Sequence, residues 1–106
     1  MIHLPTATAN GTSFHGTTFK ATPNQLIESL GEITYDGTDG KTSMEWVREL
    51  DNADIFTIYD WKYYRNIGMD EEIEWHIGGH NKTVTESAKE ELLMLLSKWK
   101  KFYLEF

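Results

Sequence analysis

The chain has 106 residues, a length typical of one domain, and we expect residues 1–106 to fold as a single unit. Apolar residues make up 40% of the sequence and cysteine is absent, which allows a modest core but excludes disulfides and thiolate metal sites. The formal net charge of −7 disfavours direct binding to nucleic acid and favours a partner with a basic surface.

The first twelve residues are rich in Thr, Ala and Asn, so residues 1–12 are predicted to form a loose arm, with a short strand at 2–4. They contain neither a basic segment nor an apolar segment of the kind that directs secretion, and we therefore expect a cytoplasmic protein. The sequence also has no apolar run long enough to cross a membrane, and its mean hydropathy is −0.50.

The β-branched and aromatic content of residues 12–22 predicts a strand, in which Gly16 marks a bulge or a hairpin turn. A short helix is predicted over 22–31, because Thr22 and Gln25 have the spacing of a capping box and Pro23 suits the first helical position. Gly31 is expected to end this helix, whose apolar face consists of Leu26, Ile27 and Leu30.

A loop is predicted over 35–42. Its Gly-Lys-Thr ending is typical of a phosphate-binding loop, but that motif requires glycine at the position of Tyr35. The alternating Asp or Asn ligands and the closing Glu of a calcium loop are missing as well. Neither kind of site is therefore expected in this segment.

Residues 41–50 and 54–64 are predicted to form two antiparallel strands joined by a tight turn at 51–53. The second of them is apolar on both sides, which favours a central position in the sheet and predicts that Tyr59 and Trp61 lie in the core. A third strand is predicted over 72–79 from its clean alternation, with two sets of side chains on opposite faces: Ile73, Trp75 and Ile77, and Glu72, Glu74 and His76.

A long helix is predicted from residue 83, with Thr83 and Glu86 as its capping box. Apolar residues recur along it at spacings of four and three, which predicts a stripe that packs on the sheet; these are Ala88, Leu92, Leu95, Trp99, Phe102 and Phe106, widened by Leu93 and Leu96. The element order β-α-β-β-β-α indicates an α+β fold, with an antiparallel sheet of about four strands and the long C-terminal helix packed on one face.

Two histidines, His76 and His80, flank a Gly-Gly pair before this helix. With Glu74, and with His15 from the first strand, they suggest a zinc site, although two scattered histidines specify none and no cofactor is predicted. With Lys82 they suggest instead an anion site at the helix start, which could hold a nucleotide phosphate. The simplest interpretation is a polar strand face followed by a turn.

The segment from Tyr59 to Asn66 combines aromatic rings with charged side chains, a composition enriched at binding hot spots. Tyr63, Tyr64 and Arg65 follow the predicted strand, so part of this group is expected to be exposed. The predicted binding residues are therefore Tyr59, Trp61, Tyr63, Tyr64, Arg65, His76, His80 and Lys82.

The segments FTIYDWKYYR and EWHIGGHN resemble stretches of small proteins of tailed phages and prophages. The resemblance covers about the middle third of the chain and implies a small cytoplasmic protein that binds a host component, as anti-CRISPR inhibitors do. No nucleophile motif accompanies it, which favours a non-enzymatic inhibitor. The alternatives are a sponge for a signalling nucleotide, a metal-dependent hydrolase using His76 and His80, and a minor virion or assembly protein; a homo-oligomer is also compatible with the sequence.

Overall fold

The computed structural model describes residues 1–34, 44–63 and 65–104, with side chains as far as residue 98. Its elements are β1 (Ser13–Ala21), α1 (Pro23–Leu30), β2 (Glu45–Glu49), β3 (Ile55–Tyr59), β4 (Ile73–Gly79) and α2 (Lys82–Leu104). The strands form one antiparallel sheet in the order β1-β4-β3-β2. The predicted α+β class and element order are confirmed. The predicted loop at 35–42 lies outside the described residues, as does Phe106.

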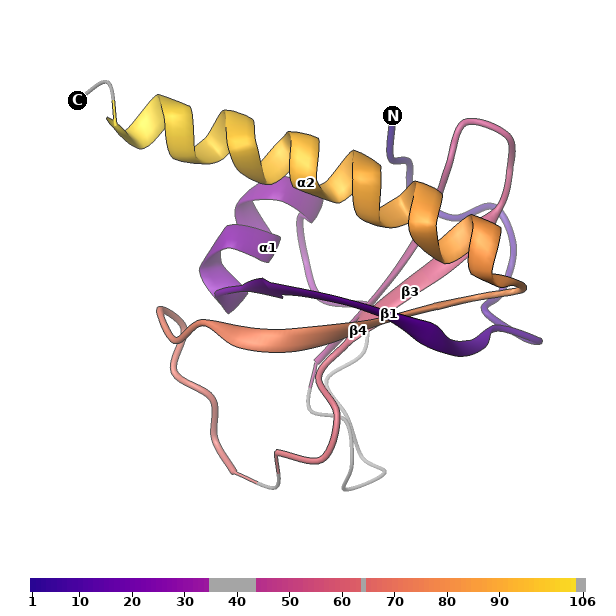
Figure 1. Cartoon of the computed structure of the whole chain (residues 1–106), viewed down its shortest axis with the longest axis horizontal. Helices are drawn as coiled ribbons and strands as arrows, with labels where there is room; N and C mark the ends of the chain where they lie inside the picture. Colours follow the sequence, from indigo (N-terminus) through magenta and orange to yellow (C-terminus); the bar gives the residue numbers. More distant parts are fainter. Residues whose placement is uncertain (35–43, 64, 105–106) are drawn as a thin grey trace.

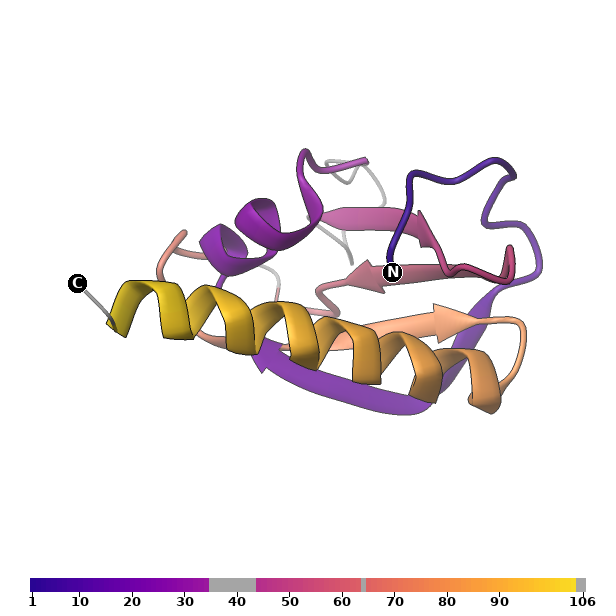
Figure 2. The same ribbon diagram turned by 90° about the horizontal axis from the view of Figure 1, so that it is seen from above.

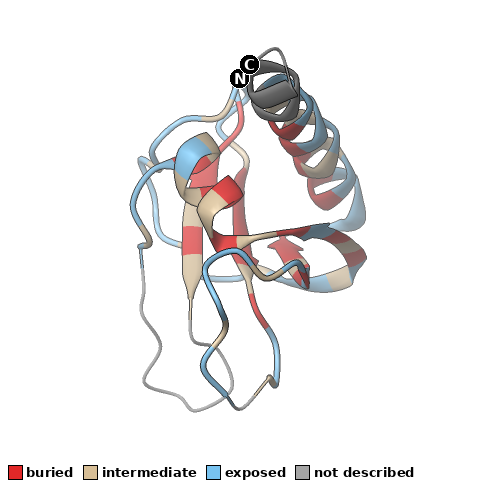
Figure 3. Cartoon of the chain, turned by 90° about the vertical axis from the view of Figure 1, so that its left-hand side faces the viewer, coloured by how far each residue is buried: buried red, intermediate tan, exposed pale blue. Residues whose placement is uncertain are grey.

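Both helices lie on one side of the sheet, and α2 lies along β1 and β4 (Figures 1 and 2). The core fills the space between these two layers, where the buried residues face one another (Figure 3). Its centre is the pair Trp46 and Trp75, whose rings meet edge to face with centroids 5.5 Å apart. Each indole N–H donates to a backbone carbonyl, which satisfies the only polar atom of a buried Trp side chain. We call the opposite side of the sheet the open face.

The short helix α1 has the predicted capping box: the Thr22 hydroxyl accepts from the Gln25 N–H, and the Gln25 side chain accepts from the Thr22 N–H. Gly31 ends it with φ at 85°, a left-handed conformation that favours glycine. Leu26 and Leu30 are buried in the core, and Ile27 packs at its margin.

The strand β1 contains the predicted bulge rather than a hairpin turn. Gly16 has φ at 87°, and the pairing with β4 shifts between Phe14 and Thr18. Thr18 lies opposite His76, so uninterrupted pairing would place Phe14 opposite His80. The bulge instead places Phe14 opposite Gly78, next to the row of side chains that contains His76.

The strand β3 is central, as predicted, but it ends at Tyr59 instead of continuing to residue 64. At Asp60 the pairing with β2 changes: its N–H still donates to the Met44 carbonyl at 3.4 Å, but its carboxylate, instead of its carbonyl, accepts from the Met44 N–H at 2.8 Å. Lys62 has φ at 59°, which no strand residue adopts. The prediction that Tyr59 and Trp61 lie in the core is therefore wrong, because Tyr59 is half-buried on the open face and Trp61 is 38% exposed.

The long helix α2 starts one residue earlier than predicted and uses a different cap. The Asn81 side chain accepts from the Val84 N–H at 3.0 Å, so Thr83 lies inside the first turn and is not the cap. The buried stripe consists of Val84, Ala88, Leu92 and Leu96, and Leu93 is 47% exposed instead of widening it. The side chains of Trp99 and Phe102 lie outside the described part of the helix.

The segment 1–12, predicted as a loose arm, is attached to β2. His3 and Glu49 exchange backbone hydrogen bonds of 2.8 and 2.9 Å, and this single bridge replaces the strand expected at residues 2–4. The Glu49 carboxylate also accepts from both the N–H and the hydroxyl of Thr6. These bonds cover the outer edge of β2 at its end.

Candidate functional site

Four rings gather on the open face of the sheet: Phe14 from β1, Tyr59 and Trp61 from the end of β3, and His76 from β4. We call them the aromatic cluster. The imidazole of His76 lies among the other three rings, with its centroid 4.0 Å from that of Phe14, 5.5 Å from Tyr59 and 6.2 Å from Trp61. It stacks on Phe14 and on Trp61, and Tyr59 meets it edge-on. The cluster therefore joins side chains from three segments of the chain.

The cluster is open to solvent on its outer side. Phe14 is 42% exposed and Trp61 is 38% exposed, although most large apolar side chains of the sheet are buried. These two rings therefore keep apolar surface that is not used for packing within the described part of the chain. Exposed aromatic rings that are held in place by neighbours form binding surfaces at a low entropy cost.

The backbone beside Trp61 is held in an unfavourable conformation. The positive φ of Lys62, at 59°, is uncommon for a residue with a side chain. It directs the Lys62 ammonium over the Trp61 ring, at 5.5 Å from the centroid. A cation–π contact of this kind stabilises the orientation of the exposed indole.

Burial lowers the pKa of His76 below its usual value, and the nearby carboxylate of Glu74 opposes this shift. The imidazole is therefore neutral at neutral pH and presents an aromatic ring to its neighbours. Burial also raises the pKa of Tyr59, and the negative charge of Glu45 adds to the effect. The cluster is thus uncharged at neutral pH, with the carboxylates of Glu45 and Glu74 beside it.

A hollow of about 210 Å³ lies beside the cluster on the open face. We call it the open-face hollow; Thr12, Ser13, Glu45, Thr57, Tyr59, Trp61 and Gly78 line it. Glu45 and Tyr59 are directly paired across β2 and β3, and Thr57 lies opposite Gly78 across β3 and β4. Its walls therefore belong to paired strands, except for Thr12 and Trp61 just beyond the strand ends.

The other predicted binding residues are engaged elsewhere. Tyr63 packs at the margin of the core and its hydroxyl accepts from the Glu74 N–H at 3.1 Å. Arg65 forms a forked ion pair with Glu71, which lowers the pKa of that carboxyl to about 2 together with a bond from Gly68. Tyr64 lies outside the described residues.

The predicted anion site at the start of α2 has a different environment from the expected one. Gly78 and Gly79 are paired residues of β4, not a turn, and Asn81 accepts the N–H of Val84 in the first turn. Lys82 donates to the His15 carbonyl and lies 3.7 Å from the Glu86 carboxylate, and His80 is exposed beside Gly11. His76 lies on the open face, so His76, His80 and Lys82 do not form one site.

Sequence reasoning missed Phe14, Glu45, Thr57 and Gly78. A signal existed for Phe14, since the bulge expected at Gly16 determines which residue of β4 it opposes. No local signal marked the other three, because their roles depend on which strands are neighbours.

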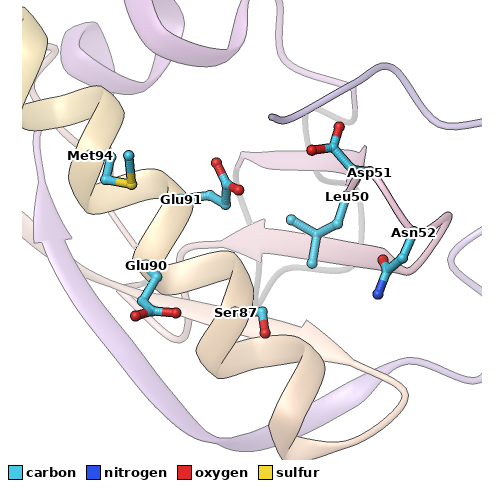
Figure 4. A pocket seen from close by; sticks show the side chains of 7 residues that line it. All are labelled: Leu50, Asp51, Asn52, Ser87, Glu90, Glu91 and Met94. Atoms are coloured by element: carbon cyan, nitrogen blue, oxygen red, sulfur yellow. The ribbon is translucent and has the colours of Figure 1, made fainter.

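A second cavity, of about 500 Å³, lies between α2 and the turn from β2 to β3 (Figure 4). Asp51, Glu90 and Glu91 make its lining acidic, and Leu50 and Met94 supply the apolar part. Asp51 already contacts the His3 ring at 2.6 Å and the Met1 amino group at 2.9 Å. We call this cavity the acidic groove; two of its carboxylates, Asp51 and Glu91, are bound by the protein's own N-terminal segment.

Comparisons with protein family models, with curated proteins and with solved structures find no match to this chain. Across the described residues, no group of three or more His, Asp or Glu side chains is arranged to hold a metal ion. Within the same residues, no helix is both long and apolar enough for a membrane span. The open face of the sheet is therefore the feature of the described chain that bears on function.

Proposed function

We propose that this chain is a non-enzymatic binding protein that holds another protein against the open face of its sheet. The observation that carries this proposal is the exposed aromatic cluster, in which Phe14 and Trp61 remain accessible while His76 and Tyr59 support them from within the sheet. Interfaces are enriched in such rings because a rigid aromatic side chain supplies much contact area and loses little entropy.

The charge of the chain favours a partner with a basic surface, since the net charge is −7 and Glu45 and Glu74 lie beside the cluster. The resemblance of two segments to small phage proteins is the basis for proposing that this partner is a host protein in the host cytoplasm. Binding would then inhibit the partner, as an anti-CRISPR protein does. The size and acidity of the chain are compatible with this role.

A nucleotide ligand has less support. The exposed rings could stack on a base. The phosphate, however, would need free N–H groups at the start of α2, where Asn81 already accepts from Val84.

The test is affinity capture from host lysate with the wild-type chain and with the double variant Phe14→Ala/Trp61→Ala. The matched control is Leu93→Ala/Met94→Ala, which removes two exposed apolar side chains from α2 on the other side of the sheet. Circular dichroism and thermal melting establish that each variant is folded. We expect the control to retain the partner and the open-face variant to lose it.

Capture of the same proteins by both variants would contradict the proposal, as would the absence of any specific partner. Native mass spectrometry of the purified chain adds a second reading. A homo-oligomer that dissociates in the Phe14→Ala/Trp61→Ala variant would assign the open face to self-association instead.

A further inference from the structure

The open-face hollow has the composition of a site for a cationic side chain. Tyr59 and Trp61 form two walls at nearly a right angle, with their centroids 6.0 Å apart and their planes at 80°. Glu45 contributes a carboxylate from the neighbouring strand. Aromatic faces and a carboxylate both attract positive charge, and the attraction is stronger where solvent is partly excluded.

One lining residue of the hollow must be glycine. A Cβ at Gly78 would lie 2.5 Å from the Thr57 hydroxyl, which already occupies that space, and 3.6 Å from the Tyr59 ring, so any other residue would displace Thr57. Gly78 has no positive φ that would require glycine for its backbone conformation. The need for glycine here is therefore steric, and it coincides with the wall residues of the hollow.

The protein already places one cation on the same indole. The Lys62 ammonium lies 5.5 Å from the centroid of the Trp61 ring. Trp61 is thus oriented by this contact and by His76, and an incoming guanidinium would take the place of the Lys62 ammonium on the indole.

We propose that the open-face hollow binds an arginine side chain of the partner, with the guanidinium between Tyr59 and Trp61 and facing the Glu45 carboxylate. This inference rests on the proposed function, because it assumes that the partner is a protein held on the open face. Arginine fits better than lysine, since a planar guanidinium stacks on aromatic rings and keeps its charge delocalised beside the carboxylate. The negative charge of the chain attracts the same residue over a longer range.

The direct test is titration of the ¹⁵N-labelled protein with three blocked tripeptides, Ala-Xaa-Ala, in which the central residue is arginine, lysine or citrulline. Citrulline has the shape of arginine without its charge. We expect saturable shifts of the Gly78 amide and of the Trp61 indole N–H with arginine, binding weaker by about tenfold with lysine, and no shift with citrulline. Equal affinity for arginine and lysine would indicate plain charge attraction and would overturn the proposal, as would binding of citrulline.

Two variants complete the test. Gly78→Ala displaces Thr57 in the wall of the hollow, and Glu45→Gln removes the charge without changing the shape. Both are expected to weaken arginine binding by at least about tenfold, and Glu45→Gln keeps the test valid if Gly78→Ala fails to fold. Unchanged affinity in Glu45→Gln would overturn the proposal.

Affinity capture distinguishes this inference from the proposed function. If Glu45→Gln retains the partner and Phe14→Ala/Trp61→Ala loses it, the arginine assignment is wrong and the open face remains the binding surface. If both variants capture the same proteins as the wild type, the proposed function itself is wrong.

Discussion

Arg48 is a buried cation that the chain surrounds with its own oxygen atoms. It is 4% exposed, and its guanidinium donates to the carbonyls of Leu30 and Glu32 and to the Thr34 hydroxyl, at distances between 2.6 and 3.1 Å. Burial lowers its pKa below the usual range. Because Leu30 is the last residue of α1, Arg48 also satisfies the end of that helix, where the dipole favours a cation.

We expect Arg48→Met to destabilise the fold by about 3 kcal/mol, because it leaves buried carbonyls at the end of α1 without donors. The matched control is Lys20→Met, the same kind of change at an exposed position of β1, which should alter the free energy of unfolding by less than about 0.5 kcal/mol. Urea denaturation of both variants measures the difference. Similar midpoints for the two would contradict this role of Arg48.

The elements β4 and α2 were both predicted, but the boundary between them was placed wrongly. The Gly-Gly pair before α2 suggested a turn, but both residues are in β4. Gly79 faces α2, where a Cβ would lie 3.0 Å from Thr85 and 3.1 Å from Val84, so glycine lets the helix approach the sheet closely. The buried Thr17 and Thr85 hydroxyls, 2.8 Å apart, add a polar link between β1 and the same turn of α2.

The start of α2 offers a direct comparison between the cap predicted from the sequence and the observed one. We expect Asn81→Ala to destabilise the protein by about 1 kcal/mol, since it removes the side-chain acceptor of the Val84 N–H. Thr83→Ala should cost much less than this, because Thr83 is exposed within the first turn. Thermal or urea unfolding measures the stability of the two variants. A larger loss of stability in Thr83→Ala than in Asn81→Ala would show that Thr83 is the cap.

In the whole molecule, one face of the sheet holds the core and the other, among the described residues, carries the exposed rings of Phe14 and Trp61. The helices cover the first face (Figure 1). The aromatic cluster and the open-face hollow occupy the second. The His76 ring is partly buried among aromatic neighbours on the open face, and its pKa is lowered. Protonation of this one residue therefore makes the stability of the fold depend on pH.

Since the pKa of His76 is lower in the folded state than its usual 6.5, the unfolded chain binds this proton more tightly. Its stabilising contribution is complete above the unfolded pKa and is lost as pH falls through the folded pKa. We expect the melting temperature to fall between pH about 7 and about 5, and to fall less in His76→Phe, which keeps the ring without the titration. Parallel profiles in the two proteins would contradict this assignment.

Local signals in the sequence, namely caps, glycine stops and periodicity, are enough to predict which elements form and in what order. The capping box of Thr22, the alternation of Ile73, Trp75 and Ile77, and the central position of the doubly apolar strand are all present in the structure. The sequence also contained three members of the aromatic cluster among the predicted binding residues, Tyr59, Trp61 and His76.

Only the tertiary structure decided which of those residues meet. Phe14 joins them because β1 pairs with β4 and because the bulge at Gly16 moves it opposite Gly78. Trp61 turns outward because β3 ends at Tyr59 and Lys62 takes a positive φ. Strand order, register and strand ends depend on contacts between distant segments, whose free energies no short window of residues contains.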